Sequence, residues 1–549
     1  MLRILYNEAM GTKDKNTLSD QQLNQLSKEQ LLSLCRVLQD KNNEYEKRLD
    51  FLTEQILLSQ HRRFGASSEK ISYAEDYEQA SFFNEAEVEA AKASGLVPET
   101  DTIDIKSHKR KKQKGKRDLD LSKFPVVRIE HKLSEEEQFC SECHKALKVV
   151  TTETYKYLKY VPAHFETEEH LVSVYSCVDS SCGHMVRASK DPSLLRGSIA
   201  TPSLVAAIMN AKYVNGIPLA RQEAEFSRNG VELDRQKMAY WMIRCSEEYL
   251  SVIYDEMKKH LLQCQYNQAD ETRVQVLHED GRKATTDSWM WVYRTSELAN
   301  APPIILFTYE QTRGSYHPKE FLSGYKGYLT TDAYKAYRSL SEDIIVTACM
   351  VHCRRYFHDA LITIPEDKRK GTVAEEAIKR IAMLYQIETM LADKPAEQRY
   401  EERLKQSQPL LDAFFAWLKS MELASDAKSL IGKAIAYALN QQEYLKRYLM
   451  DGSIPIDNSA TERAIRPFAQ GRRAWLFCNT PNGAKASAVI YSIVETAKAN
   501  GLHPYNYLSH LLEMMPSHMS SISRDFIKDL LPWSETLPDK CRVKKVELK

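Results

Sequence analysis

The chain has 549 residues, which is more than one hydrophobic core supports, so we expect three or more domains. Its hydrophobic fraction of 43% and charged fraction of 28% are ordinary for folded proteins and exclude global disorder and a fibrous architecture. The net charge is only +1, so local basic patches must meet any anionic partner. No run approaches the roughly 18 apolar residues that span a bilayer, and we expect a cytoplasmic protein without a membrane partner.

Residues 1–66 carry a heptad pattern that predicts a long helix or a short coiled coil. Apolar side chains recur every seven residues and at interleaved positions; they are Leu31, Leu38, Tyr45, Leu52, Leu49 and Ile56. Cys35 and Asn42 take two interleaved positions and weaken the seam. A helical hairpin within one chain and a dimer of two chains therefore both remain open.

Residues 67–117 form an acidic segment followed by a basic one. Residues 75–104 hold nine Asp or Glu, and "KSHKRKKQKGKR" at 106–117 holds eight Lys or Arg in twelve positions. Such a density repels itself and favours a polyanion, although a solvated spacer is the simpler alternative. The candidates for contacts with DNA phosphates are Lys109, Arg110, Lys111 and Lys112.

Residues 118–195 turn β-like and carry two close cysteine pairs. The odd total of eleven cysteines argues against a disulfide framework and favours free thiols or metal ligands. Four thiolates on two loops suit tetrahedral Zn²⁺, and the candidate ligands are Cys140, Cys143, Cys177 and Cys182. The second pair, "CVDSSC", is wide, so His184 or His144 as a substitute ligand, and four unliganded core cysteines, remain alternatives.

Residues 196–256 predict three helices separated by "NGIP" and "NGVELD", with Asp234 capping the last one. This arrangement fits a helix-turn-helix in which Arg235, Gln236 and Lys237 would read DNA. Helical units of this kind also occur as plain connectors, so both interpretations stay open.

Residues 257–515 hold five β signals in close order that predict a mixed sheet: "RVQVLHED", "WMWVYRTS", "PIILFTYE", "KGYLTTDAY" and "DIIVTACMVHCRRYF". Asp270 is expected at the start of the first strand and Asp332 at the end of the fourth. If those strands are adjacent, the two carboxylates converge, as they must to hold two Mg²⁺ or Mn²⁺ ions for phosphodiester chemistry. Helical periodicity predicts an insertion at about 360–455, and residues 516–549 form a tail.

Glu462 is the candidate for a third carboxylate in "PIDNSATERAIRPFAQGRRAW". Ser459 and Glu462 also match a capping box, in which the glutamate only closes a helix N-terminus. The surrounding arginines favour a ligand beside a phosphate backbone; they are Arg463, Arg466, Arg472 and Arg473. Trp475 in "AWLF" is expected in a buried strand, with stacking on an unpaired base as the alternative.

Several of these stretches resemble the transposases of the insertion sequence 66 family: "RRFGASSEK", the basic linker, the cysteine module, "AKYVNGIPLARQEAEFSRNGVELDRQ", "ADET", "TDAYKAY", "HCRRYF" and the long block from "IDNSATERAIRPFAQGRRAWLF" to "PYNYL". The resemblance implies an RNase H-like core whose acidic triad is Asp270, Asp332 and Glu462. It implies a structural zinc module. The second cysteine pair of that module is commonly spaced more tightly in the family than "CVDSSC" is in this chain. The family's "HARRKF"-type motif is kept as His352, Arg354 and Arg355.

The chain is therefore expected to be an α+β multidomain DNA transposase that nicks and joins insertion-sequence ends. The expected partners are terminal inverted repeats, target DNA, further copies of the chain on DNA and small accessory proteins of the same element, in a nucleoid-associated bacterial setting. Two alternatives remain: a catalytically silent descendant that only binds DNA ends, and a stand-alone RNase H-like nuclease.

Overall fold

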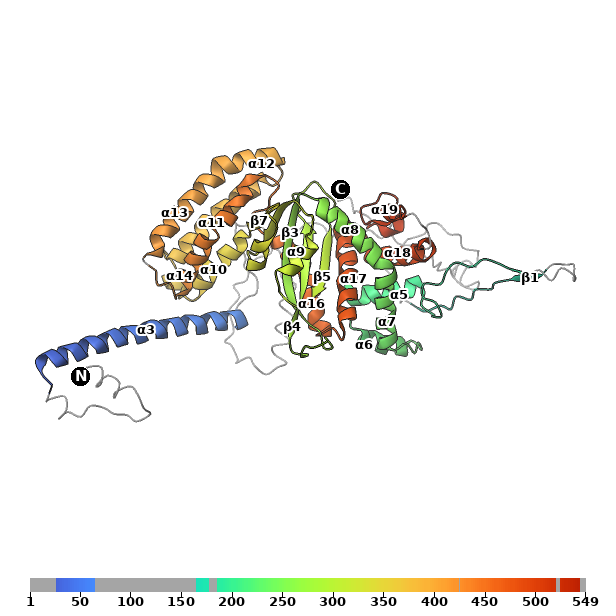
Figure 1. Ribbon diagram of the computed structural model, residues 1–549, viewed down its shortest axis with the longest axis horizontal. Coiled ribbons are helices and arrows are strands. Elements are labelled where there is room, and N and C mark those ends of the chain that lie inside the picture. Colours follow the sequence, from blue (N-terminus) through green and yellow to red (C-terminus); the bar gives the residue numbers. More distant parts are fainter. Residues whose placement is uncertain (1–25, 65–163, 177–184, 424, 520–523, 544–549) are drawn as a thin grey trace, which may run out of the picture. The chain divides into compact units, whose positions relative to one another are not determined.

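The computed structural model describes residues 26–64, 164–176, 185–423, 425–519 and 524–543 (Figure 1). The predicted zinc ligands and the basic linker candidates lie outside these ranges. They are Cys140, Cys143, Cys177, Cys182, Lys109, Arg110, Lys111 and Lys112. Within the described ranges the chain has a helical N-terminal region and a mixed sheet, which confirms the α+β class.

The N-terminal segment is one uninterrupted helix, α3 (Lys28–Phe64), as its heptad pattern predicted. The hairpin alternative is wrong for residues 26–64, because no turn interrupts this helix. Leu49 and Ile56 of the apolar seam are 65% and 58% exposed, whereas Leu58 is buried against the helical region that follows the sheet. Pairing of the seam with a second chain remains a prediction.

Two short strands lie at the ends of the segment that carries the second cysteine pair. β1 (Val174–Ser176) pairs antiparallel with β2 (Met185–Arg187), and Ser176 faces Met185 across the pair. The chain thus enters and leaves residues 177–184 through one two-stranded ladder.

The three helices predicted after residue 196 are present as α5 (Pro202–Tyr213), α6 (Leu219–Arg228) and α7 (Arg235–Cys245). Asp234 caps α7 as predicted, since its Oδ1 accepts a hydrogen bond of 2.7 Å from the backbone N–H of Lys237. A π-helical segment, Ser246–Leu250, joins α7 to α8 (Ser251–Gln263), which leads directly into the sheet. These helices share one hydrophobic core with the sheet.

A five-stranded mixed sheet follows, as the five β signals predicted. Its strands are β3 (Tyr266–Gln275), β4 (Asp287–Thr295), β5 (Ile305–Glu310), β6 (Gly327–Thr331) and β7 (Ile344–Ala348). Their spatial order is β5-β4-β3-β6-β7, and β4 runs antiparallel to the other four. Because β3 begins earlier than expected, Asp270 lies in the middle of the strand and not at its start.

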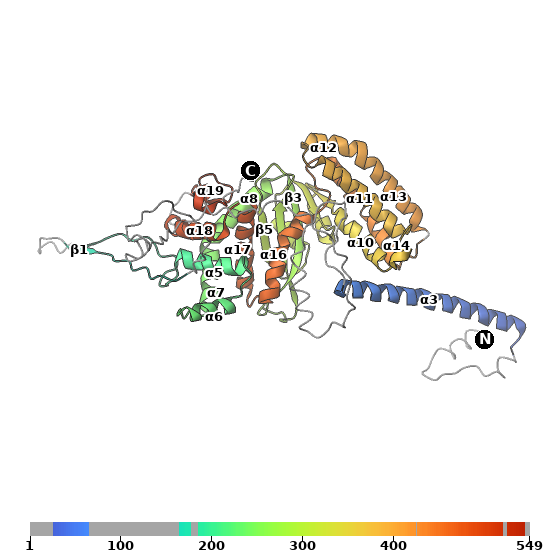
Figure 2. The ribbon, with the colours of Figure 1, turned by 180° about the vertical axis from the view of Figure 1, so that it is seen from behind.

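Helices cover the two faces of this sheet. On one face, Trp291 and Tyr293 of β4 contact α9 (Tyr316–Phe321), where Phe321 stacks on Tyr293 at 3.8 Å between ring centroids. On the other face, Phe307 of β5 contacts Phe468 of α16 (Ser459–Trp475). Figure 1 shows α9 in front of the strands, and Figure 2 shows α16 in front of them from behind.

The free edge of β5 is covered by α17 (Pro481–Ala499), which runs beside it in Figure 1. The hydroxyl of Thr496 accepts a hydrogen bond from the N–H of Ile305 and donates one to its carbonyl, over 3.0 and 2.9 Å. Ser492 accepts from the N–H of Phe307 over 2.8 Å. Edge-strand groups that would otherwise invite another strand are thereby satisfied. The core then continues through α18 (Pro504–His518) and α19 (Ile527–Leu530).

A helical region separates β7 from α16. Its helices are α10 (Met350–Ile362), α11 (Val373–Leu391), α12 (Ala396–Glu402), α13 (Gln408–Glu422), α14 (Leu430–Asn440) and α15 (Gln442–Lys446). They form a second hydrophobic core beside that of the sheet. Arg403 is fully buried there and forms an ion pair of 2.6 Å with Glu388. None of the helices in the described ranges combines the length and apolarity needed to cross a lipid bilayer.

Candidate active site

Asp270 lies on β3, and Asp332 follows the last residue of the neighbouring parallel strand β6. β3 and β6 pair in parallel with Gln268 facing Thr330, and the same register continued by two residues places Asp270 opposite Asp332. β6 ends at Thr331, so Asp332 lies just beyond its carboxyl end, where open sheets with parallel strands commonly bind ligands. The predicted convergence of these two carboxylates is present.

Glu271, which the sequence did not single out, joins the two aspartates. One carboxylate oxygen from each of Asp270, Glu271 and Asp332 lies within 4.8 Å of the others. Asp270 accepts a hydrogen bond of 2.8 Å from the N–H of Glu271, and Asp332 accepts one of 2.8 Å from the N–H of Tyr334. Both short backbone contacts fix the direction of a carboxylate.

The turn that presents Asp332 contains a strained residue. Ala333 has φ of 68°, a left-handed conformation that a residue with a Cβ rarely adopts and that costs about 1–2 kcal/mol. Its N–H donates to the hydroxyl of Thr331 over 3.1 Å. Strain of this kind is concentrated at functional sites, and here it belongs to the turn that aims Asp332.

Arg313 is the cation of this cluster. The side chain of Glu271 is 0% exposed and accepts hydrogen bonds from Arg313 Nε over 2.7 Å, from the Arg313 guanidinium and from the Tyr337 hydroxyl over 2.7 Å. Arg313 also lies 3.8 Å from Asp332 Oδ2. Its guanidinium lies over the rings of Trp289 and Tyr334, 4.8 and 3.7 Å from their centroids. The guanidinium is therefore held by the carboxylate of Glu271 and by the two aromatic rings.

The charges at this cluster do not balance. Burial, together with the negative charges of Glu271 and Asp332, holds the pKa of Asp270 well above its ordinary value. Burial and Asp332 also raise the pKa of Glu271, although Arg313 opposes this. A bound divalent cation would relieve the repulsion, and an all-oxygen donor set suits Mg²⁺ or Mn²⁺. The residues present thus fit a hard metal ion.

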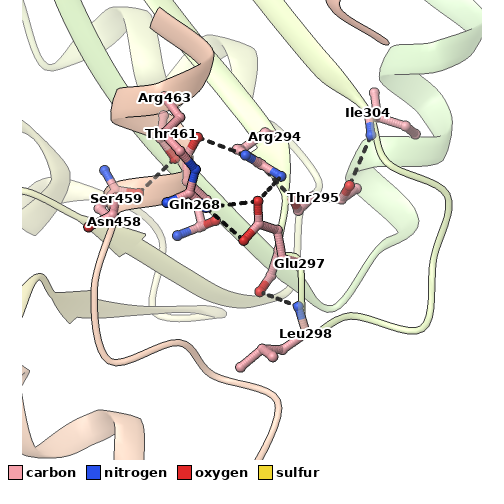
Figure 3. A network of polar contacts seen from close by, with 12 residues as sticks. Gln268, Arg294, Thr295, Glu297, Leu298, Ile304, Asn458, Ser459, Thr461 and Arg463 are labelled. Atoms are coloured by element: carbon pink, nitrogen blue, oxygen red, sulfur yellow. Dashed lines mark hydrogen bonds and ion pairs between the residues drawn. The ribbon is translucent and has the colours of Figure 1, made fainter. Parts of the chain in front are cut away.

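The helix that carries Glu462 is anchored to β3. Asn458 is its N-cap and donates through Nδ2 to the carbonyl of Ala269 over 2.9 Å, while Thr461 donates to Asn458 Oδ1 over 2.7 Å. Figure 3 shows Asn458, Ser459 and Thr461 together at this helix start. The capping-box hypothesis is wrong, because Ser459 is not the N-cap and the carboxylate of Glu462 contacts Arg355 on α10. Ala269 precedes Asp270, so the anchor links two candidate acids.

The carboxylate of Glu462 lies 3.5 Å from Arg355 and 3.7 Å from His352, both on α10. It does not belong to the group of three acids within 4.8 Å. Its charge nevertheless contributes to the raised pKa of Asp270, so the two groups share one electrostatic environment. Burial and the charge of Arg355 lower the pKa of His352, which favours a neutral imidazole. The structure thus brings the carboxylates of Asp270 and Asp332 together, whereas that of Glu462 lies outside this group and contacts α10.

Comparison of the sequence with known families bears on this arrangement. A sequence profile described as the transposase IS66 family matches residues 197–486, more than half of the chain. The chain belongs to the IS66 transposase family. A second profile, the IS66 C-terminal element, matches residues 492–533. A third, described as transposase C of IS166 homeodomain, matches residues 51–129. The resemblance first seen in single motifs is confirmed.

Three relatives of this IS66-family chain come from Sinorhizobium fredii. Uncharacterized protein y4qI is 32% identical over 64% of the chain and 65% of its own length. Uncharacterized protein y4jD is 28% identical over 77% of the chain and 83% of its own length. Uncharacterized protein y4hP is 28% identical over 68% of the chain and 69% of its own length. The chain thus covers just under two thirds of the first relative.

The arginines that follow Glu462 in the IS66-family chain face different surroundings. Arg463 forms an exposed double contact with Glu297 at 3.0 and 2.9 Å, and Figure 3 shows both Arg294 and Arg463 directed at that glutamate. Arg472 donates to the backbone carbonyl of Arg273 on β3. Arg466 and Arg473 are exposed.

Arg354 and Arg355 differ in their exposure to solvent. Arg354 is 8% exposed, whereas the side chain of Arg355 is 43% exposed and contacts Glu462. Arg355 is therefore the better placed of the two for a phosphate contact. The predicted helix-turn-helix residues Arg235, Gln236 and Lys237 are all exposed at the start of α7.

The expectation of a buried strand at "AWLF" is wrong. Trp475 is the last residue of α16, and it packs edge-on against Phe468 at 5.6 Å between ring centroids. Leu476 and Phe477 are 64% and 42% exposed. Pro467 and Gly471 lie inside this helix, and both residues weaken a helical signal in the sequence.

Proposed function

We propose that this chain is a metal-dependent DNA transposase that nicks insertion-sequence ends and joins them to target DNA through Asp270, Asp332 and Glu462. The observation that carries the proposal is the convergence of the Asp270 and Asp332 carboxylates, whose oxygens lie within 4.8 Å of each other, in a chain that belongs to a transposase family. The strand order, with β4 alone reversed, supports an RNase H-like core.

The three carboxylates would hold the metal ions. Divalent cations held there would supply activation of the attacking oxygen and stabilisation of the leaving oxygen of a phosphodiester. Backbone groups of the chain orient the carboxylates that would bind the metal ions. The N–H of Glu271 orients Asp270, and the N–H of Tyr334 orients Asp332. Arg355 and His352 hold Glu462 from the side of α10. Such preorganised ligands lower the cost of reaching the reactive geometry.

DNA would approach over the surface that carries exposed cationic side chains. Arg466 and Arg473 are exposed on α16, the helix that begins beside the carboxylates, and Arg355 is half-exposed next to Glu462. Guanidinium groups suit phosphate oxygens because they donate two parallel hydrogen bonds. The homeodomain-type match at residues 51–129, which includes Lys109–Lys112, supports a DNA-binding role for the N-terminal region. The zinc module with Cys140, Cys143, Cys177 and Cys182 would assist in recognising terminal repeats.

A joining assay separates this proposal from its two alternatives. Labelled oligonucleotides that end in the recessed 3′ hydroxyl of an element end are mixed with supercoiled plasmid and Mg²⁺. We expect the label to become covalently attached to the plasmid. Plasmid nicking without attachment would favour a stand-alone nuclease, and binding to element ends without either reaction would favour a silent DNA-end-binding protein.

A further inference from the structure

Two tyrosines form a stacked pair beside the candidate site. Tyr356 of α10 and Tyr437 of α14 lie 4.3 Å apart between ring centroids, with an interplanar angle of 23°. Tyr437 is partly buried, and its hydroxyl donates to the backbone carbonyl of Asp332 over 3.4 Å. Tyr356 is 43% exposed. The inner ring thus contacts the acidic turn, and the outer ring is accessible to solvent.

The helix α10 brings Tyr356 close to the third carboxylate as well. His352 and Tyr356 are four residues apart and so lie on one face, one turn or ~6 Å along the helix. His352 is 3.7 Å from Glu462, and Arg355, the residue before Tyr356, is 3.5 Å from it. An exposed aromatic ring and a half-exposed guanidinium are therefore consecutive residues on the helix that contacts the Glu462 carboxylate.

We infer that Tyr356, supported from below by Tyr437, is a stacking platform for one unpaired nucleobase of the DNA strand whose phosphate lies at the carboxylates. Single-stranded nucleic acids are bound by aromatic rings for the bases together with cationic groups for the backbone, and Tyr356 and Arg355 supply both. An apolar protein partner would not be favoured next to a guanidinium and three acids. The inference rests on the proposed function and specifies how that site holds its DNA.

Trp475 is the other aromatic that the sequence offered for base stacking, and its position argues against that role. One side of its ring packs against Phe468 within α16, and Trp475 belongs to the periphery of the sheet core. Tyr356 stacks on Tyr437 and is 43% exposed. Of these two candidates, Tyr356 is the exposed one, and its stacking partner Tyr437 contacts the turn of Asp332.

The test uses the full chain without divalent metal and a forked DNA oligonucleotide whose single-stranded arm carries 2-aminopurine. Stacking on tyrosine quenches this fluorescent base, so binding of the wild type should quench it. Tyr356→Ala should abolish the quenching and weaken binding of the fork about 5- to 150-fold, the range for loss of one stacked base. Tyr356→Phe should retain both, because stacking needs only the ring. Tyr400→Ala, at another exposed tyrosine on α12, is the matched control and should behave as the wild type.

The outcomes also separate this inference from the proposed function. Quenching and fork affinity that survive Tyr356→Ala would overturn the stacking platform, whatever the catalytic activity of the wild type. Quenching that depends on Tyr356 in a protein that never cleaves or joins element ends would support the platform and contradict the transposase reaction. Because Tyr356 is exposed, the alanine variant should fold, and an unchanged melting temperature would verify this.

Discussion

Arg313 donates two hydrogen bonds to the fully buried carboxylate of Glu271 and lies 3.8 Å from Asp332. The guanidinium thus partly neutralises two acids of a cluster that would otherwise carry three negative charges. A metal ion that bound Asp332 would have to share this carboxylate with Arg313. The arginine is best regarded as a positioning residue that keeps Glu271 and Asp332 in place.

Removal of Arg313 should destabilise the fold. Arg313→Gln leaves Glu271 buried with the Tyr337 hydroxyl but without its cationic partner, and breaking such a pair should lower the free energy of unfolding by about 3–5 kcal/mol. Urea denaturation measures this change. The double variant Glu271→Gln, Arg313→Gln should recover part of the loss, because residue 271 no longer carries a buried charge that lacks a cationic partner. Equal stability of Arg313→Gln and the wild type would contradict the account of this pair.

The raised pKa of Asp270 has a consequence for stability. The folded chain binds a proton at Asp270 more tightly than the unfolded chain, whose aspartate pKa is about 3.9. Wild-type stability should therefore fall as the pH rises from about 4 through the raised pKa. Asp270→Asn lacks this loss and should melt at a higher temperature than the wild type at pH 7 without metal, with the difference shrinking toward pH 4.

Divalent metal provides the control for the Asp270 prediction. Mg²⁺ should raise the melting temperature of the wild type at pH 7, because a bound cation offsets the repulsion among the carboxylates. The same addition should have little effect on Asp270→Asn. An Asp270→Asn variant that is less stable than the wild type at pH 7 without metal would show that the aspartate is not under electrostatic strain.

Asn458 should be needed to position Glu462. Asn458→Ala removes the hydrogen bond to the Ala269 carbonyl, which joins α16 to β3. We expect end cleavage to fall about 10- to 100-fold, since small displacements of catalytic groups are costly. Mg²⁺-induced stabilisation through Asp270 should persist. Ser459→Ala is the matched control, because Ser459 is the first residue of α16 and not its N-cap, and it should cleave as the wild type does. Equal loss in both variants would refute the role of Asn458.

Removal of Arg466 and release of Arg463 from its ion pair should change DNA binding in opposite directions. Arg466→Ala should weaken DNA binding and reduce the slope of log affinity against log salt by about 1, the effect of one phosphate contact. Glu297→Gln releases Arg463 from its exposed ion pair and should strengthen DNA binding by up to about 5-fold, because such pairs are worth at most about 1 kcal/mol. Fluorescence anisotropy across a salt series measures both. Weaker binding by Glu297→Gln would contradict a phosphate-binding Arg463.

Much of the sheet and part of the site were predictable from local patterns. The alternating stretches predicted all five strands, and the expected adjacency of the strands that carry Asp270 and Asp332 predicted the convergence of two acids, although Asp270 lies in mid-strand. Asp234 capped its helix as expected because an N-cap depends only on residues within one turn.

Long-range contacts explain what the local patterns missed. Arg313 comes from the loop after β5 and reaches Glu271 across the sheet, and nothing in "EQTRGSY" indicates that partner. The adjacent acids in "ADET" were a signal for Glu271, but strand alternation alone sends neighbours to opposite faces. Asn458 displaced Ser459 as the cap because the Ala269 carbonyl, 189 residues earlier, fixes its side chain.

The most direct test of the central claim is cleavage of a labelled element end in Mg²⁺ by the wild type and by Asp270→Asn, Asp332→Asn and Glu462→Gln, with DNA binding measured on the same samples. The account predicts cleavage by the wild type, loss of cleavage in all three variants and retention of DNA binding. Wild-type rates of cleavage in any one variant would show that its carboxylate does not belong to the catalytic site.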